Sequence, residues 1–259
     1  MDLQLQGKHV LITGGSRGIG LACAREFLRE GCKVSLAGRD PAHMEAARAS
    51  LGGEAKGFCA DLRDAAAALR LVDEVEAQRG PIDVLVNSAG AARRTPYAEL
   101  EPQAWQDAMQ SKFFTYVHVM DPVVRRMGAR GAGAIVNVVG MGGKVASPTH
   151  LAGGAANAAL MLASAGLAAA WGPSGVRVNA VNPTLTLTDR LAEGLAADAR
   201  LRGMTPEDVL RQSEQKMPLG RLARPEEIAA AVVFLASPRA SYISGAILSM
   251  DGASTPMVV

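Results

Sequence analysis

Residues 13–20 read Thr-Gly-Gly-Ser-Arg-Gly-Ile-Gly and lie between two segments of different periodicity. The apolar run 9–12 precedes them, and residues 21–28 follow with the apolar spacing of an amphipathic helix. A strand that leads through a glycine-rich turn into a helix N-terminus forms an anion site, because free backbone N–H groups and the helix dipole face the turn. The segment therefore predicts a site for the pyrophosphate of a dinucleotide.

The glycine spacing in this turn differs from the most common dinucleotide motif. Gly14, Gly18 and Gly20 follow the spacing G-x-x-x-G-x-G rather than G-x-G-x-x-G. An ordinary glycine-rich turn is the alternative interpretation. The strand before the turn and the helix after it favour the nucleotide site.

Length and composition indicate one large α/β domain. The chain has 259 residues, of which 49% are hydrophobic and 20% are charged, and its net charge is +2. This near balance gives no reason to expect nucleic acid or a membrane surface as a partner. Cys23, Cys32 and Cys59 lack metal-ligand spacing and fit reduced thiols, so we expect a cytoplasmic protein without a metal site.

Neither a secretory signal nor a membrane span is expected. Residues 1–7 contain no basic segment followed by an apolar one. The longest nearly apolar run, 155–171, is slightly short for a span, is rich in alanine and contains Asn157 and Ser164. We expect a helix that packs inside the protein or against another subunit.

Short β-type runs alternate with helical patterns, which favours a parallel sheet covered by helices on both faces. Asp40-Pro41 and Thr205-Pro206 each give an N-cap followed by proline, and Arg224-Pro225 begins a helix with a poor cap. The expected strands are residues 10–13, 33–37, 55–59, 84–87, 134–139, 176–181 and 247–250.

No repeat or linker divides the chain, so residues 1–259 are expected to form a single domain. The most polar long connection is 185–219, which carries its own helix signals. It suits a mobile lid over a ligand cleft, and a static helical excursion is the alternative.

The order of these segments resembles the short-chain dehydrogenase/reductase family over nearly the whole chain. The resemblance implies an α/β fold, namely a single Rossmann-type doubly wound domain with a seven-stranded parallel sheet, and a homodimer or homotetramer. The matching pieces are residues 13–20, Asp61-Leu62, Asn87-Ser88-Ala89-Gly90, Ile135-Val136-Asn137-Val138, Asn182-Pro183, Pro218-Leu219-Gly220-Arg221, Pro225-Glu226-Glu227, Gly245 and Asp251-Gly252.

The resemblance also assigns roles around an NADP or NAD cofactor. The three glycines would hold the pyrophosphate, Asp61 the adenine amine, and Asn87 and Gly90 the adenine ribose side. Thr188, five residues after Pro183, would hold the nicotinamide amide. The full expected set is Gly14, Ser16, Arg17, Gly18, Ile19, Gly20, Arg39, Asp61, Leu62, Asn87, Ala89, Gly90, Pro183 and Thr188.

Charge after the second strand favours NADP over NAD. An acid there would bind the ribose 2′-hydroxyl of NAD and repel a 2′-phosphate. This chain has Arg39 at that turn and Arg17 in the glycine loop, and two guanidinium groups suit a phosphate. The alternative is that both arginines are solvated or paired with acids, of which Asp40 is the nearest.

The family's usual catalytic residues are missing at the positions where the resemblance places them. In the family a tyrosine is the acid or base on the substrate oxygen, a lysine lowers the tyrosine's pKa, a serine positions the oxygen and an asparagine holds a water. Counting along this chain gives Gly153 for the tyrosine, Asn157 for the lysine, Gly140 for the serine and Lys112 for the asparagine.

Several side chains are candidates to replace the missing set. Lys112 and Asn157 look exchanged, so we expect one polar pair near the nicotinamide ribose; drift after loss of function is the alternative. Gly153 and its neighbour predict a void where the ring would stand. His150 is the leading acid or base, because it alone nearby titrates close to neutral pH, and Ser147 and Thr149 are further hydroxyl donors.

A cationic cleft mouth is also predicted, from Arg93, Arg94, Lys112 and Lys144. An anionic substrate such as a carboxylate or an acyl-CoA would gain from such a field, whereas a solvated charged face is the alternative.

Three functions fit these residues. The first is an NADP-dependent oxidoreductase on a carbonyl or alcohol, with a rearranged proton-transfer group. The second is a non-redox hydrolase or lyase that uses His150 and Lys112 in the same cleft. The third is a catalytically silent dinucleotide-binding protein or partner subunit, because the fold alone does not choose among them.

Overall fold

A parallel sheet forms the centre of the molecule, and its strands carry apolar side chains on both faces. The computed structural model describes residues 1–90 and 92–256. Within them the strand order is β3-β2-β1-β4-β5-β6-β7. The seven strands are β1 (His9–Thr13), β2 (Lys33–Gly38), β3 (Lys56–Cys59), β4 (Val84–Asn87), β5 (Gly133–Val138), β6 (Val176–Pro183) and β7 (Ile247–Met250). The predicted fold class is confirmed, and the expected strands are correct to within two residues at each end.

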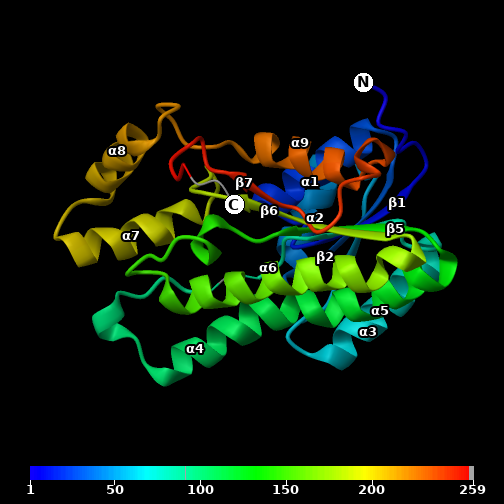
Figure 1. The fold of residues 1–259 in the computed structure, drawn as a ribbon, viewed down its shortest axis with the longest axis horizontal. Coiled ribbons are helices and arrows are strands. Elements are labelled where there is room, and N and C mark those ends of the chain that lie inside the picture. Colours follow the sequence, from blue (N-terminus) through cyan, green and yellow to red (C-terminus); the bar gives the residue numbers. More distant parts are fainter. Residues whose placement is uncertain (91, 257–259) are drawn as a thin grey trace.

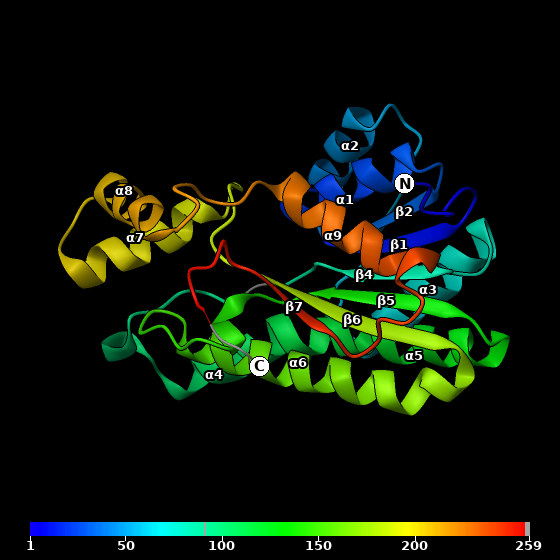
Figure 2. The same ribbon diagram turned by 45° about the horizontal axis from the view of Figure 1, so that its top comes forward.

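Helices cover both faces of this sheet (Figures 1 and 2). One hydrophobic cluster joins the sheet to α1 (Gly18–Arg29), α2 (Pro41–Ser50) and α9 (Pro225–Ala236). A second cluster joins it to α3 (Ala65–Arg79), α5 (Thr115–Arg130) and α6 (Leu151–Trp171). Shorter elements complete this layer and the connections: α4 (Pro102–Ala108), the π-helical turn η2 (Met109–Phe114), and the 3-10 turns η1 (Tyr97–Glu99), η3 (Met141–Gly143), η4 (Gly172–Ser174) and η5 (Pro238–Ala240).

The predicted helix starts are confirmed by their caps. The Asp40 carboxylate accepts a hydrogen bond from the His43 backbone N–H at 3.0 Å. Thr205 Oγ1 accepts one from the Asp208 N–H at 3.2 Å. At the third start the Glu227 carboxylate accepts the Arg224 N–H at 2.8 Å, which compensates for the poor cap there.

The polar segment 185–219 folds into two helices, α7 (Leu191–Arg202) and α8 (Pro206–Lys216). They project from one end of the sheet, apart from the two helical layers (Figure 2). Arg200 on α7 forms an ion pair with Glu99 at 3.1 Å, which ties this segment to the loop after β4. The predicted helix signals are therefore correct, and movement of the segment stays a prediction.

The long alanine-rich helix was expected to pack inside the protein or against another subunit. By length and composition, residues 151–174 are sufficiently apolar to cross a membrane, with a mean hydropathy of 1.4. In the structure α6 packs along β6, as core helices with the same composition do. Its outer side is more open, since the Leu162 side chain is 78% exposed.

Candidate functional site

The glycine-rich turn packs so closely that side chains would not fit at two positions. A Cβ atom at Gly14 would lie 2.7 Å from the backbone of Ala89, and one at Gly20 would lie 2.2 Å from the Gly14 carbonyl oxygen. The turn is thereby pressed against the end of β4, at the point where strand order reverses. The first N–H groups of α1 lack helical partners there, so the turn offers the predicted anion site.

A ladder of buried side chains holds the carboxyl ends of three neighbouring strands in register. Thr13 Oγ1 donates to Asn87 Oδ1 at 3.2 Å, and Asn87 Nδ2 donates to Asn137 Oδ1 at 3.0 Å. Asn137 Nδ2 in turn donates to Ser164 Oγ on α6 at 2.9 Å. The Asn87 carboxamide, expected at the adenine ribose, is thus engaged within the protein, and it positions the loop that continues to Gly90.

The two arginines expected at a 2′-phosphate are free of acidic partners. Arg17 and Arg39 form no hydrogen bond and no ion pair within residues 1–90 and 92–256. Asp40, the acid expected to compete for them, instead caps α2, and the His43 N–H lowers the pKa of its carboxyl. A phosphate group would therefore meet guanidinium groups that interact with the charges of Asp61 and Asp40 but form no ion pair with them.

Asp61, expected at the adenine amine, lies after β3 and pairs with Arg63. Arg63 Nε is 3.0 Å from both carboxylate oxygens, and this pairing, followed by the charge of Arg39, lowers the pKa of Asp61. Its neighbour Leu62 is buried. The acid is thus ionised and partly exposed at the expected edge of the sheet.

The structure brings the end of β6 to the glycine turn. Thr188 follows Pro183, and a Cβ atom at Gly18 would lie 3.4 Å from its Cγ2 atom. The residue expected at the nicotinamide amide therefore lies beside the loop expected at the pyrophosphate. The remaining expected cofactor residues, Ser16 and Ile19, are within that loop.

The void expected at Gly153 does not exist, because the His150 ring fills it. A Cβ atom at Gly153 would lie 2.1 Å from His150 Cε1, and one at Gly142 would lie 2.7 Å from His150 Cδ2. The imidazole therefore stands where the resemblance places the tyrosine side chain. Its packing requires both glycines, which explains why small residues surround this histidine.

Two buried polar atoms beside this ring have no hydrogen-bond partner among the described residues. They are His150 Nδ1 and Asn157 Oδ1, and Asn157 as a whole is only 5% exposed. His150 Nε2 and Asn157 Nδ2 lie 3.3 Å and 3.5 Å from the same point, the Cβ position of Gly142. The Nε2 and Nδ2 atoms are therefore neighbours, and neither belongs to the buried unpaired atoms, so these two are the polar atoms that a ligand would meet here.

Lys112 is buried, but the pairing with Asn157 that we expected is wrong. Its Nζ atom donates to Tyr116 Oη at 2.9 Å and to the Val138 carbonyl oxygen at 3.1 Å. Tyr116 Oη donates to the same carbonyl at 2.5 Å. Lys112 lies in the π-helical turn η2, and Tyr116 follows it about one helical turn later. Side chains at this spacing are neighbours on a helix, so the sequence contained a signal for this contact that sequence reasoning missed.

Positive charge surrounds the histidine. Burial is the main cause that lowers the His150 pKa to about 4, and the charges of Arg94, Lys112 and Arg190 add to it, while Asp198 opposes it. Burial likewise lowers the Lys112 pKa to about 7. Sequence reasoning missed Arg190, which lies two residues after Thr188. His150 is therefore neutral at pH 7 in the unliganded protein.

The other members of the predicted cationic mouth lie elsewhere. Lys144 Nζ donates to Ser249 Oγ at 3.1 Å, beside β7, and Arg93 is exposed. The hydroxyl candidates are also in use, since Thr149 Oγ1 donates to the Asp198 carboxylate and Ser147 Oγ lies 3.3 Å from Thr149 Oγ1. His150 is thus the candidate whose polar atoms stay available.

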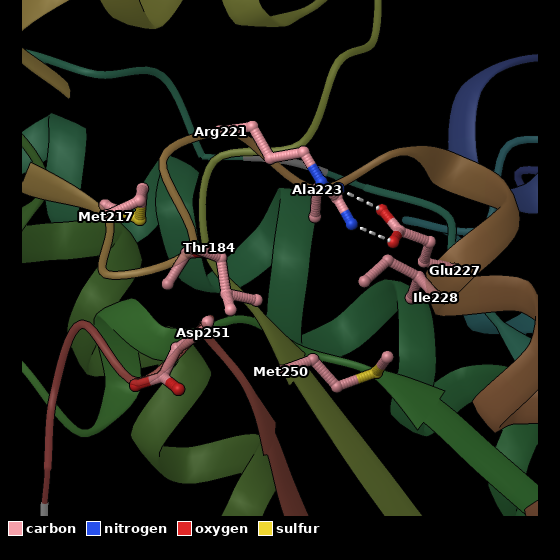
Figure 3. A pocket seen from close by; sticks show the side chains of 10 residues that line it. Thr184, Met217, Arg221, Ala223, Glu227, Ile228, Met250 and Asp251 are labelled. Carbon is pink, nitrogen blue, oxygen red and sulfur yellow. Dashed lines mark hydrogen bonds and ion pairs between the residues drawn. The ribbon is translucent and has the colours of Figure 1, made fainter. Parts of the chain in front are cut away.

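A separate pocket of about 160 Å³ opens beyond the ends of β6 and β7 (Figure 3). Arg221 and Glu227 form an ion pair at 2.6 Å on its rim, and Thr184, Met217 and Met250 line it. None of the expected cofactor or catalytic residues lines this pocket. We therefore assign the candidate chemistry to the surroundings of His150, where the titratable groups gather.

Comparison with known proteins agrees with the fold described above. A family model described as enoyl-(acyl carrier protein) reductase matches residues 14–255. The chain is 40% identical to D-threitol dehydrogenase of Mycolicibacterium smegmatis, over 98% of this chain and 95% of the relative. It is 34% identical to gluconate 5-dehydrogenase of Gluconobacter oxydans, over 97% and 96%. L-sorbose reductase of Gluconobacter frateurii, solved with NADPH and L-sorbose, superposes with a TM-score of 0.90 at 30% identity, over 100% of both chains.

The depressed pKa of His150 predicts a specific loss of stability in acid. In the unfolded chain the histidine has a pKa of 6.5, whereas in the folded protein its pKa is about 4. Between these two pH values the unfolded chain therefore binds a proton that the folded protein does not. Stability is therefore lost as the pH falls through this window, by about 3 kcal/mol from this residue. We expect His150→Gln to lose about 3 kcal/mol less than the wild type there, measured by urea unfolding without ligands. Parallel pH profiles would contradict the assignment.

Proposed function

Since the chain belongs to the short-chain dehydrogenase/reductase family, we propose that it is an NADP-dependent oxidoreductase in which His150 transfers the proton between an alcohol and a carbonyl. The observation that carries this proposal is the His150 ring in the space beside Gly153 and Gly142, next to the unpaired Asn157 oxygen. The Nε2 atom of the ring has no hydrogen-bond partner among the described residues and is not among the buried unpaired atoms, so we assign the substrate hydroxyl to it.

The charge at the end of β2 supports NADP as the cofactor. Arg17 and Arg39 are free of acidic partners in the described chain, and both flank the site expected for a 2′-phosphate. The NADPH in the L-sorbose reductase structure supports the same choice. We propose that Gly14, Gly18 and Gly20 hold the pyrophosphate, with Thr188 at the nicotinamide amide, and bound NADP supplies a hydride acceptor or donor at the ring.

The electrostatics favour alcohol oxidation at neutral pH. Neutral His150 takes the hydroxyl proton while the carbon that bears it loses a hydride, and the alcohol becomes a carbonyl compound. In the reverse direction the same ring, once protonated, returns the proton to the oxygen. Asn157 would orient that oxygen through its amide, and the Lys112 ammonium would stabilise negative charge that develops on it.

The relatives support a small hydroxylated substrate. D-threitol dehydrogenase and gluconate 5-dehydrogenase are both named for small polyhydroxylated compounds. We propose a substrate of this class for the cleft under residues 185–219, which we propose as its lid. A silent dinucleotide-binding protein and a hydrolase or lyase on the same fold are the alternatives that the experiments below separate.

Assembly through α5 and α6 is part of the same proposal. A hollow of about 350 Å³ between the two helices is lined by Phe113, Val117, Met120, Asp121, Ala163, Gly166 and Leu167. Leu162 on α6 is 78% exposed, so a second copy would bury apolar surface there. We propose a homodimer or homotetramer related by two-fold axes. The cytoplasmic location stays a prediction.

Reversal of charge at Arg39 tests the cofactor. We expect Arg39→Asp to weaken NADPH binding about 10- to 100-fold, because each charge-assisted hydrogen bond to a phosphate contributes about 1.5–3 kcal/mol, and to leave NADH binding little changed. Cofactor fluorescence titration measures both affinities. Arg29→Asp, an equal charge change at the far end of α1, serves as the control. Equal losses for NADPH and NADH would contradict the 2′-phosphate site.

Removal of the imidazole tests the proton-transfer group. We expect His150→Gln to lower kcat for alcohol oxidation about 100- to 10,000-fold, the range of general acid–base catalysis, with NADPH affinity within about twofold. Steady-state rates with NADP and a panel of sugar alcohols measure this. Loss of activity in Ser147→Ala instead would assign the role to that hydroxyl, and a wild type without turnover would favour a silent protein.

A further inference from the structure

Two arginines flank His150 without an acid that neutralises them. Arg94 comes from the loop after β4, and Arg190 directly precedes α7. They reach the histidine from different parts of the chain, since the charges of both act on it. Arg94 is half-buried and Arg190 is exposed, so a ligand from solvent can reach both guanidinium groups, and a cluster of unpaired cations favours an anionic ligand.

The position of Arg94 is fixed by small and polar neighbours. Its Nη1 atom donates to Thr149 Oγ1 at 3.4 Å, directly before His150. Its Nε atom lies 3.0 Å from the Cβ position of Gly194 on α7, so the guanidinium lies against the helix backbone. A larger residue at Gly194 would displace it. The fork of Arg94 is thus held beside the imidazole with most of its donors unused.

Arg190 has no bonded partner in the parts of the chain that the structure describes. Burial lowers the pKa of its guanidinium, although part of the side chain is exposed, and its charge acts on Lys112 and Tyr116 as well as on His150. It caps α7 one helical turn before Gly194, so it lies on the side of α7 against which the Arg94 guanidinium packs.

The acids near this cluster do not pair with the arginines. Asp198 accepts the hydroxyl hydrogen bond of Thr149, and the charge of exposed Glu193 acts to raise the pKa of the Arg190 guanidinium without forming an ion pair with it in the described chain. Neither forms an ion pair with Arg94 or Arg190 among the described residues. A net positive charge is therefore left next to the imidazole.

We infer that Arg94 and Arg190 form a binding site for a carboxylate group of the substrate, so that the preferred substrate is a hydroxy acid or its oxo acid. Planar guanidinium forks match carboxylates through paired hydrogen bonds, which explains two arginines rather than two lysines. This inference rests on the proposed function and specifies its substrate class.

Such an anion would also tune the histidine. It would offset the charges of Arg94, Arg190 and Lys112, to which only Asp198 is opposed, and so raise the affinity of His150 for a proton. The acid substrate would then assist its own oxidation, because the imidazole becomes a stronger base when the carboxylate is bound.

The test compares 5-keto-D-gluconate with L-sorbose, which carries a hydroxymethyl group in place of the carboxylate. We expect Arg94→Met and Arg190→Met each to lower the ratio of kcat/KM for acid over neutral ketose about 10- to 100-fold, as loss of a charge-assisted hydrogen bond predicts. Arg93→Met, the exposed neighbour, should leave the ratio within about twofold of the wild type. An unchanged ratio in both cleft variants would overturn the inference.

A binding measurement keeps the inference testable without turnover. Calorimetric titration of malonate into the NADPH-saturated protein should show binding that Arg190→Met weakens at least about tenfold and Arg93→Met does not. The His150 ring, followed by NMR, should gain a higher pKa with malonate in the wild type only. If Arg190→Met weakened the binding of NADPH instead of malonate, Arg190 would belong to the cofactor phosphates, and the inference would be overturned.

The two proposals fail in distinguishable ways. Absence of NADPH binding, or of turnover with both ketoses, would contradict the proposed function. The malonate titration of the unliganded protein, with the same variants, would still decide whether the two arginines bind a carboxylate. Turnover of L-sorbose without a preference for the acid, together with malonate binding that no variant changes, would reject the carboxylate site alone.

Discussion

The buried hydrogen bonds from Thr13 through Asn87 and Asn137 to Ser164 fix the edge of the sheet on which the site is built. Polar side chains in such a core are stable only when each finds its partners, so the ladder allows one register for β1, β4 and β5. That register sets the glycine turn against the end of β4, at the reversal of strand order where α/β sheets bind nucleotides. The remaining groups of the cleft come from loops anchored at this edge.

The proposed proton transfer depends on the packing of the His150 ring against two glycines. Glycine at positions 142 and 153 leaves room for a side chain from elsewhere, and the His150 imidazole takes it. The ring is held by packing rather than by hydrogen bonds, so no group of the described chain occupies its Nε2 atom. Burial of the ring, and after it the positive charge of neighbouring side chains, lowers the His150 pKa and keeps the ring neutral, as a base must be before it accepts a proton. Shape and electrostatics therefore agree on one residue.

Sequence reasoning predicted the fold because its signals are local. The apolar runs, the proline after each N-cap and the glycine turn all report on neighbours within a few residues, and all of them are confirmed. The side-chain contacts were predicted less well. Lys112 bonds with Tyr116 instead of Asn157, and the expected void is full. The partners in these two contacts are close in sequence, so their spacing was a usable signal. What periodicity does not report is the distance from Lys112 to Asn157, which lies on another helix.

Arg190 illustrates the same limit. It directly precedes a helix in a polar segment and is exposed, as charged residues in such segments normally are. Only the fold brings it to the histidine, together with Arg94 from another loop.

A crystal structure of the protein with NADPH tests the central claim most directly. The account predicts the pyrophosphate on the N–H groups after Gly14, the 2′-phosphate between Arg17 and Arg39, and the nicotinamide ring facing His150. An empty groove, or a nicotinamide ring turned away from His150, would contradict it.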